Sequence, residues 1–330
     1  MCILSAGCVQ KKEKEFHMTT SDFGSDVSHC IGRYQISLPT GFVMNSGSVG
    51  EFHPQSMSSD EPAINLEIVA YGTNVDSFKA RVQKRIAELR EEKKGSGLDY
   101  LAAMQSLGDD LVKLRVGNVE NFYRSEIHAL KGKSYIIASL ESSDNQYEVA
   151  ENRLREFVAG IVMTDSSGDT GKGFCIGPLT INGDFKREWY QFGYRSVEKP
   201  DVVISVDVDT FSKDDPETLF DRVSGPSSLL SIFGVKHSVL RKREVIVSGM
   251  QAQEWLGAAR LPERNDKKLS FALETVRQTP SLMAPKIHVG FDSGENGLDG
   301  AAHETSMTED EAVDQWDRLV ASIRPRELSR

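Results

Sequence analysis

The sequence lacks both the long apolar runs of membrane-spanning proteins and the compact motifs of many enzyme classes. None of its 330 residues fall in a run approaching the roughly 20 consecutive apolar residues that cross a bilayer as a helix. It contains no Gly-x-Ser-x-Gly elbow, no His-Glu-x-x-His pair and no glycine-rich dinucleotide fingerprint. The sequence therefore gives no support to a helical membrane protein, a serine hydrolase, a zinc protease or a dinucleotide enzyme.

Basic residues are in the minority, because 39 Lys and Arg stand against 49 Asp and Glu, for a net charge of -10. A nucleic-acid-binding surface needs concentrated Lys and Arg to displace the counterions of the phosphate backbone, so this balance argues against nucleic acid. Anionic lipid head groups also repel an acidic protein unless it is tethered to them. A protein partner with a basic surface remains compatible with the charge.

Cysteine is sparse, and no closely spaced set of Cys and His has the arrangement that binds zinc. The chain has only four cysteines and seven histidines, which are scattered along it. We therefore predict no metal site, no cofactor and no catalytic residue. Asp and Glu are numerous, so a hydrolase that uses two distant carboxylates stays open as an alternative.

The first residues place small side chains directly before a cysteine, at Ala6-Gly7-Cys8. A bacterial lipoprotein signal ends in this way, although the basic start and the apolar segment of a full signal are missing. We expect Cys8 to be lipidated in a protein whose start is truncated, with residues 1–28 as signal remnant and tether. The alternative is a chance Ala-Gly-Cys at a cytoplasmic N-terminus.

The chain does contain a stretch that it uses twice. Cys30-Ile31-Gly32 leads into a short strand-like run, and Cys175-Ile176-Gly177 does the same 145 residues later. A glycine followed six residues later by an aromatic residue recurs as Gly117 to Tyr123 and Gly249 to Trp255. Each half also closes with a helix whose apolar residues share one spacing: Ala150, Leu154, Val158 and Ile161; Ala312, Trp316, Val320 and Ile323.

This repeat predicts an α+β fold of two related modules, each a mainly antiparallel sheet packed with helices. Residues 29–163 make the N-terminal module and residues 174–326 the C-terminal module. Residues 164–173 between them are small, polar and rich in glycine, so we expect a flexible linker. Residues 45–62, rich in Ser, Gly and Pro, are expected to form a loop.

Strand faces are readable in the second module, where apolar residues at 202, 204, 206 and 208 alternate with mostly polar neighbours. This period of two predicts a sheet with one buried and one mostly solvated face.

The cysteines at the start of each module are the remaining pair once Cys2 and Cys8 are set aside. Cys30 and Cys175 can form a disulfide in an oxidising compartment or remain two buried thiols, and both alternatives stay open.

Acidic residues gather near the end of the chain, because Ile287 to Asp317 contains nine acids and neither Lys nor Arg. Its glycine-rich part, residues 290–300, is expected to be an exposed acidic loop. The functional interpretation is an electrostatic contact with a basic partner surface through Asp292, Glu295, Asp299 and Glu304. The alternative is a solvated loop followed by the acids that ordinarily begin a helix.

Four stretches taken in order resemble a known family. They are Gly32 to Pro39, Gly173 to Gly177, Gly249 to Trp255 and Trp316 to Leu319. Together they are similar to the immunity proteins that neutralise a type VI secretion phospholipase effector of the lipase-family-4 group. The resemblance covers about residues 30 to 325, and it depends on the order of the four stretches more than on any one of them.

The resemblance implies a periplasmic protein, often lipid-anchored and without catalytic activity, that binds a cognate phospholipase effector. Such proteins clamp the effector between two domains and block its active-site entrance and the movement of its lid. A glycine-rich hinge between two rigid sheets would suit such a clamp. An envelope lipoprotein that binds a ligand or an assembly partner in the inter-module cleft is the alternative function.

Overall fold

The structure, a computed structural model, contains a twice-repeated order of strands and helices. It describes residues 25–326 apart from 59, 97–99, 120–121, 165–171, 212–216, 225–235, 261–265, 277–278 and 295–303. The first half comprises β1 (Asp26–Gly32), β2 (Tyr34–Pro39), β3 (Phe42–Met44), β4 (Ser48–Pro54), β5 (Ile64–Ala70), α1 (Val75–Ser96), β6 (Leu101–Ser106), β7 (Leu111–Val119), β8 (Phe122–Lys131), β9 (Ser134–Ser143), the 3₁₀ turn η1 (Asp144–Gln146), α2 (Tyr147–Ala159) and β10 (Ile161–Met163).

The second half repeats this order with different loops. It comprises β11 (Phe174–Ile176), β12 (Leu179–Ile181), β13 (Phe185–Ser196), β14 (Val202–Asp209), α3 (Leu219–Ser224), β15 (Lys236–Val247), β16 (Met250–Arg260), β17 (Lys267–Thr275), β18 (Lys286–Ser293), α5 (Glu309–Ser322) and β19 (Arg324–Pro325). No helix among the described residues is long and apolar enough to span a membrane.

The strands form two sheets, and each sheet is centred on one strand from each half. The 13-stranded sheet has the order β15-β16-β17-β18-β14-β13-β4-β5-β9-β8-β7-β6, with β3 added beside β13. Read outward from the central β13·β4 pair, the two arms contain equivalent strands in the same order. The six-stranded sheet, β10-β12-β11-β1-β2-β19, is likewise centred on the equivalent strands β11 and β1.

Strand pairing therefore joins the two halves directly, in addition to the peptide segment that connects them. The strand that ends the first half, β10, pairs with β12 of the second, and β19 at the end of the second half pairs with β2 of the first. Every strand pairing described is antiparallel, which confirms the predicted α+β class with its mainly antiparallel sheets. The expected hinge between two separate sheets is wrong, because β4 and β13 join both arms into one sheet.

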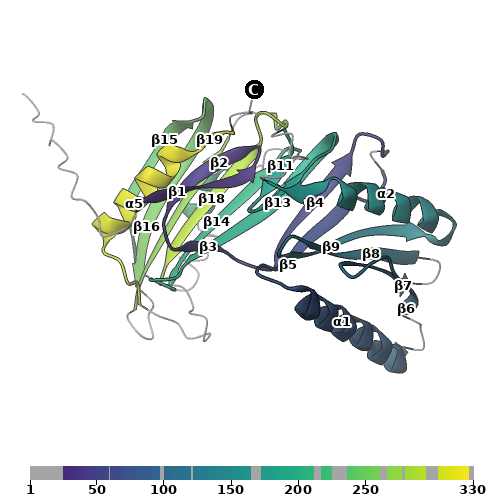
Figure 1. Ribbon diagram of the computed structural model, residues 1–330. Helices are drawn as coiled ribbons and strands as arrows, with labels where there is room; N and C mark the ends of the chain where they lie inside the picture. Colours follow the sequence, from purple (N-terminus) through teal and green to yellow (C-terminus); the bar gives the residue numbers. More distant parts are fainter. Residues whose placement is uncertain are drawn as a thin grey trace, which may run out of the picture.

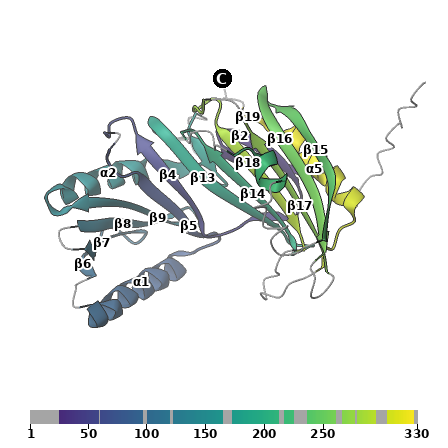
Figure 2. The ribbon, with the colours of Figure 1, turned by 180° about the vertical axis from the view of Figure 1, so that it is seen from behind.

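One apolar core fills the space between the two sheets. It takes buried residues from both halves, among them Ile31, Phe52, Phe174 and Trp316, which are at most 1% exposed. Figure 1 shows the small sheet, α5 and α2 together on one side of the large sheet. A second, smaller core lies under α1, whose apolar stripe packs on β7, β8 and β9. Figure 2 shows the opposite side of the molecule.

Several local expectations are met because they depend on nearest neighbours. The residues at 202, 204, 206 and 208 are all buried and those between them only partly so, as the alternation predicted. At the start of α5 the side chains of Thr308 and Glu311 form a reciprocal capping box, which supplies partners to backbone N–H groups that a helix end otherwise leaves unbonded.

Two expectations are wrong. Residues 48–54 do not belong to a loop, because they form β4 at the centre of the large sheet. The glycine–aromatic pairs are not equivalent either: Gly117 and Tyr123 lie on β7 and β8, whereas Gly249 turns the chain between β15 and β16. The closing helices α2 and α5 do occupy equivalent places.

Candidate partner-binding surface

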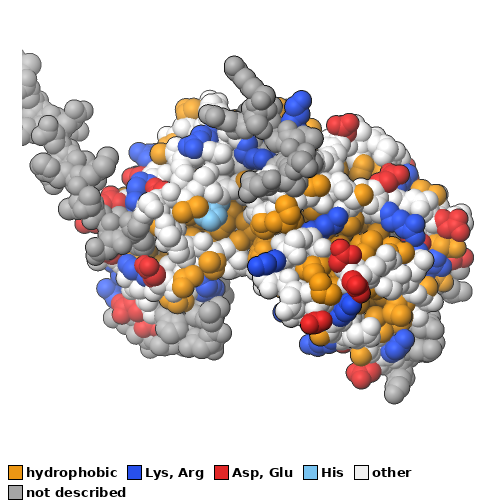
Figure 3. All heavy atoms as spheres, viewed as in Figure 1, with side chains coloured by type: hydrophobic (Ala, Val, Ile, Leu, Met, Phe, Trp, Pro, Cys, Tyr) orange, Lys and Arg blue, Asp and Glu red, His pale blue; other side chains and the backbone are white. Residues whose placement is uncertain are grey.

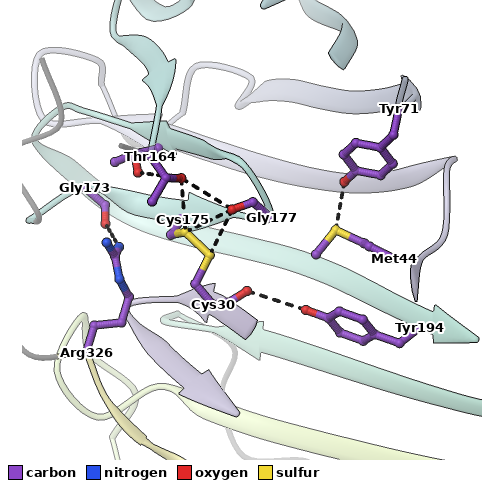
Figure 4. The surroundings of a disulfide bond; sticks show 10 residues. Cys30, Met44, Tyr71, Thr164, Gly173, Cys175, Gly177, Tyr194 and Arg326 are labelled. Carbon is purple, nitrogen blue, oxygen red and sulfur yellow. Dashed lines mark hydrogen bonds between the residues drawn. A yellow bond between two sulfur atoms is a disulfide. The ribbon is translucent and has the colours of Figure 1, made fainter. Parts of the chain in front are cut away.

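A disulfide lies at the centre of the small sheet. Cys30 on β1 and Cys175 on β11 are bonded through their Sγ atoms, with their Cα atoms 5.8 Å apart. Both precede Ile-Gly, so the bond joins the same position of the two repeats. Figure 4 shows the two sulfur atoms between adjacent strands, with Thr164 and Gly177 beside them. The bond is thus a covalent tie between the halves at the middle of the fold.

The opposite face of the large sheet has a centre that the described helices leave uncovered. Helix α1 packs on one arm, over Leu114 and Tyr135, and α3 contacts β16 on the other. The central strands β4, β13 and β14 lie between these helices. Because alternate side chains point to opposite faces of a sheet, burial of Tyr190 and Phe192 in the core turns Trp189 and Gln191 toward this open face.

A pocket of about 210 Å³ lies on the open face. It is lined by Trp189, Asp207, Asp209, Arg222, Glu274, Lys286 and His288. Strand pairing explains how they meet: β13 pairs with β14 and β14 with β18, which places Trp189 opposite Asp209 and Asp207 opposite His288. The pocket therefore sits next to the β4·β13 junction of the two halves.

The charges in the pocket are unequally compensated. Glu274 is 5% exposed and has Lys286 Nζ 3.0 Å from its Oε1, His288 Nδ1 3.7 Å from its Oε2, and Arg222 in contact. Burial raises the pKa of Glu274, but these neighbours outweigh it and lower the pKa to about 2. Glu274 is thus a carboxylate that stays ionised and keeps its three basic neighbours in place.

Asp207 has no such compensation. Burial raises the pKa of its carboxyl group, and the nearby Asp209 adds to this effect while His288 opposes it. Within the described part of the chain we find no hydrogen bond or ion pair to Asp207, although Asp209 accepts one from the N–H of Phe211 at 2.9 Å. A half-buried carboxylate in this position favours the approach of a cation, such as a Lys or Arg side chain of a partner.

Figure 3 shows that the molecule has two lobes with a notch between their lower ends. The notch lies below β3 and β5 in this view, so it marks the junction of the two arms of the large sheet. Exposed apolar side chains belong to this region, since Val43 on β3 is 52% exposed and Val197 at the end of β13 is 61% exposed. The apolar residues at the notch and the charged pocket on the open face together suit an interface with another protein.

Of the four residues predicted to bind a partner, Asp292 and Glu304 lie in the described part of the chain. Asp292 is not in a loop, because it lies on β18 opposite Val203 and Ser270, between two strands. Glu304 is exposed before α5. Glu295, Asp299 and Cys8 lie outside the described residues. No group of three His, Cys, Asp or Glu that could hold a metal ion occurs among the residues that are described.

The pocket itself was missed by sequence reasoning, although part of the signal was present. The alternation over 202–209 already assigned Asp207 and Asp209 to the solvated face. What the sequence did not reveal is that β18, nearly 80 residues later, would place Lys286 and His288 beside them.

A family model matches the second half of the chain. Residues 169–328 match the family model of the "Tle cognate immunity protein 4 C-terminal domain", which confirms the resemblance seen in the sequence for that stretch. A search of curated proteins finds no significant match.

Two solved structures share the fold over nearly the whole chain. The apo immunity protein TplEi of the T6SS from Pseudomonas aeruginosa is 21% identical, with a TM-score of 0.63, over 92% of this chain and 98% of its own. The crystal structure of a Tle4–Tli4 complex contains a chain that is 22% identical, with the same TM-score and the same coverage. TplEi has also been solved with an "L" peptide, at 21% identity and a TM-score of 0.60.

Proposed function

We propose that this chain, whose residues 169–328 match the Tle cognate immunity protein 4 family, is an immunity protein that binds and inhibits a type VI secretion phospholipase effector. The family match carries this proposal, and it is supported by a fold shared with TplEi and Tli4 over 92% of the chain. The protein would act by binding alone and catalyse no reaction.

The notch and the open face supply the place where the effector would bind. The two lobes belong to one continuous sheet, so the gap between them is set when the protein folds rather than when it binds. A preformed surface loses less conformational entropy on association than a hinged one. We assign the clamp to this surface, where it would cover the entrance and the lid of the effector's active site.

We also propose that the protein works in the periplasm. Disulfides persist in oxidising compartments and are rare in the cytosol, so the Cys30–Cys175 bond supports this location. Lipidation of Cys8 would add a tether to the membrane.

The test measures phospholipase activity of the effector encoded next to this gene, with increasing amounts of the purified protein. We expect inhibition that is complete near equimolar amounts, and co-elution of the two proteins. Asp207→Lys should weaken inhibition at least tenfold because it places a cation where a basic partner group would bind. Glu148→Lys on α2, an equal charge change on the other side of the large sheet, should leave inhibition within twofold.

An effector that remains fully active and elutes separately at excess protein would refute the proposed function. Equal loss of inhibition in both variants would instead leave the function standing and reject the assignment to the open face.

A further inference from the structure

A groove lies between the C-terminal half of α2 and the strands β7 and β8. Helix α2 packs on β8 and β9, and an ion pair joins it to β7, with Lys113 Nζ 2.6 Å from Oε2 of Glu151. Leu111 lies two residues before Lys113 on β7, and Arg155 lies one turn after Glu151 on α2, so both are on the same side of this ion pair. The ion pair therefore closes the groove at one end.

The groove contains a pocket of about 350 Å³ with an apolar floor. Ile127 and Ala129 point to the same face of β8, and each is 1% exposed. Val158 of α2 and Leu107, which lies before β7, line its sides, the first buried and the second 37% exposed. A concave pocket of this size with a mainly apolar lining is typical of sites for small, largely apolar ligands.

Two cations border the pocket without an ion-pair partner. Lys131 at the end of β8 and the exposed Arg155 of α2 both line it, and within the described part of the chain their side chains form no hydrogen bond or ion pair. Asp110 is the one acid among the lining residues. Burial lowers the pKa of Lys131, and Asp110 opposes this effect. One further negative charge would therefore balance the two cations of the pocket.

Basic residues in two other pockets differ in this respect, because acids already hold them. Lys267 Nζ is 2.8 Å from Oε1 of Glu309, and Lys286 Nζ is 3.0 Å from Oε1 of Glu274. An anionic ligand would have to compete with those carboxylates, whereas at Lys131 it would displace no partner. Charge complementarity thus favours an anion in the groove beside α2, and the apolar floor favours an attached hydrocarbon chain. Figure 1 shows α2 lying across β8 and β9, and Figure 3, in the same view, shows apolar side chains below this helix with Lys and Arg side chains beside them.

We propose that the groove beside α2 binds an amphipathic anion of the alkyl carboxylate class, with its hydrocarbon chain on Ile127 and Ala129 and its carboxylate between Lys131 and Arg155. The chain would cover apolar surface that Leu107 now exposes to water. The carboxylate would accept charge-assisted hydrogen bonds from the ammonium and guanidinium groups. This site lies on the side of the large sheet opposite the open-face pocket, and it does not depend on the proposed immunity function.

The proposal is tested by calorimetry and NMR with hexanoate, octanoate and decanoate, each below its micelle concentration. In about 0.15 M salt, where charges further apart than about 8 Å are screened, we expect one saturable site on the full-length protein. Affinity should rise about fourfold with each added methylene until the pocket is filled. Decyltrimethylammonium, a cationic chain of similar length, should bind at least tenfold more weakly than decanoate.

Methyl signals locate the ligand on the protein. Those of Leu111 and Ile127 should shift on addition of octanoate, whereas those of Leu256 and Leu273, buried in the other arm of the large sheet, should not. Shifts found mainly in the other arm would contradict the assignment to this groove.

A matched pair of variants separates charge from shape. Lys131→Met removes the charge but keeps a long side chain, so octanoate should bind at least tenfold more weakly while 1-octanol binds within twofold of its affinity for the wild type. Lys133→Met, the same change at an exposed position that does not line the pocket, should alter octanoate binding less than twofold. No saturable site for decanoate, equal affinity for the cationic chain, or equal effects of the two variants would overturn the proposal.

Discussion

At the scale of single residues, Glu126 shows how several donors stabilise a buried carboxylate. Glu126 on β8 is 3% exposed and accepts hydrogen bonds from Arg85 Nη2 and Arg124 Nε, both at 3.0 Å. His128 Nε2 lies 3.0 Å from the same carboxylate, and its Nδ1 is 2.6 Å from the hydroxyl of Tyr135. Burial raises the pKa of Glu126, but His128 and Arg85 outweigh it and lower the pKa to about 2.

This shift predicts how stability depends on pH. The folded pKa lies below the unfolded one, so the ionised carboxylate stabilises the protein above the unfolded pKa, and the contribution is lost as pH falls toward 2. We expect Glu126→Gln to lower the free energy of unfolding at pH 7 by roughly 3 kcal/mol, from the size of the shift. The difference from the wild type should shrink between about pH 5 and 2.

Urea denaturation of both proteins across this pH range measures the effect. Glu88→Gln, at an exposed position on α1, is the control and should give a small difference at every pH. A difference in the free energy of unfolding between Glu126→Gln and the wild type that stays constant down to pH 3 would contradict the prediction.

At the scale of elements, β4 is a central strand whose sequence does not have the pattern typical of one. Its residues Ser-Val-Gly-Glu-Phe-His-Pro contain few large apolar side chains, and two of its buried positions are Ser48 and Gly50. The reason lies on the neighbouring strand: a Cβ at Gly50 would lie 2.2 Å from Cδ2 of Tyr190 and 2.5 Å from the carbonyl oxygen of Trp189. The ring of Tyr190 fills the space that a side chain on β4 would otherwise occupy.

Gly50→Ala should therefore destabilise the protein, because the contact with a backbone carbonyl can be relieved only by moving a strand. We expect a loss of about 1 to 3 kcal/mol in the free energy of unfolding, as for other overpacked cores. Gly108→Ala, in the turn before β7, is the control, since its Cβ would meet only a side-chain oxygen of Asp110 at 3.3 Å. Equal unfolding midpoints for the two variants would show that β4 and β13 can move apart to accept the methyl group without loss of stability.

At the scale of the whole molecule, the halves are bound together by strand pairs and by a covalent bond. Strands pair between them at β1·β11, β3·β13, β4·β13, β10·β12 and β2·β19, and the disulfide adds a covalent link. A bidentate ion pair also crosses between the halves, with Arg33 Nη2 and Nε 2.6 and 2.9 Å from the carboxylate of Glu188. Each half therefore completes the sheets of the other.

Cutting the chain between the halves should not separate them. With a protease site inserted within residues 165–171, the cleaved protein should elute as a single particle of unchanged size, even after Cys30 and Cys175 are replaced by Ser. In the uncut chain, the free energy of unfolding of this double variant should fall by about 4 to 5 kcal/mol, because the lost disulfide closes a loop with a sequence separation of 145 residues. Two species eluting apart under native conditions would show instead that the halves are independent domains.

Features that depend on neighbouring residues could be predicted from the sequence. The capping box at Thr308, the alternation over 202–209 and the repeated Cys-Ile-Gly depend on residues close together in the chain, and all were visible without the structure. The family resemblance was visible for the same reason, because it depends on the order of such short stretches.

How the two repeats combine could not be predicted in this way. That β4 and β13 join two arms into one sheet, and that β18 brings His288 to Asp207, depends on pairing between strands far apart in the chain. Such pairings are selected by the packing of a whole core, with Tyr190 over Gly50 as one part of it, and no short stretch of sequence carries that information.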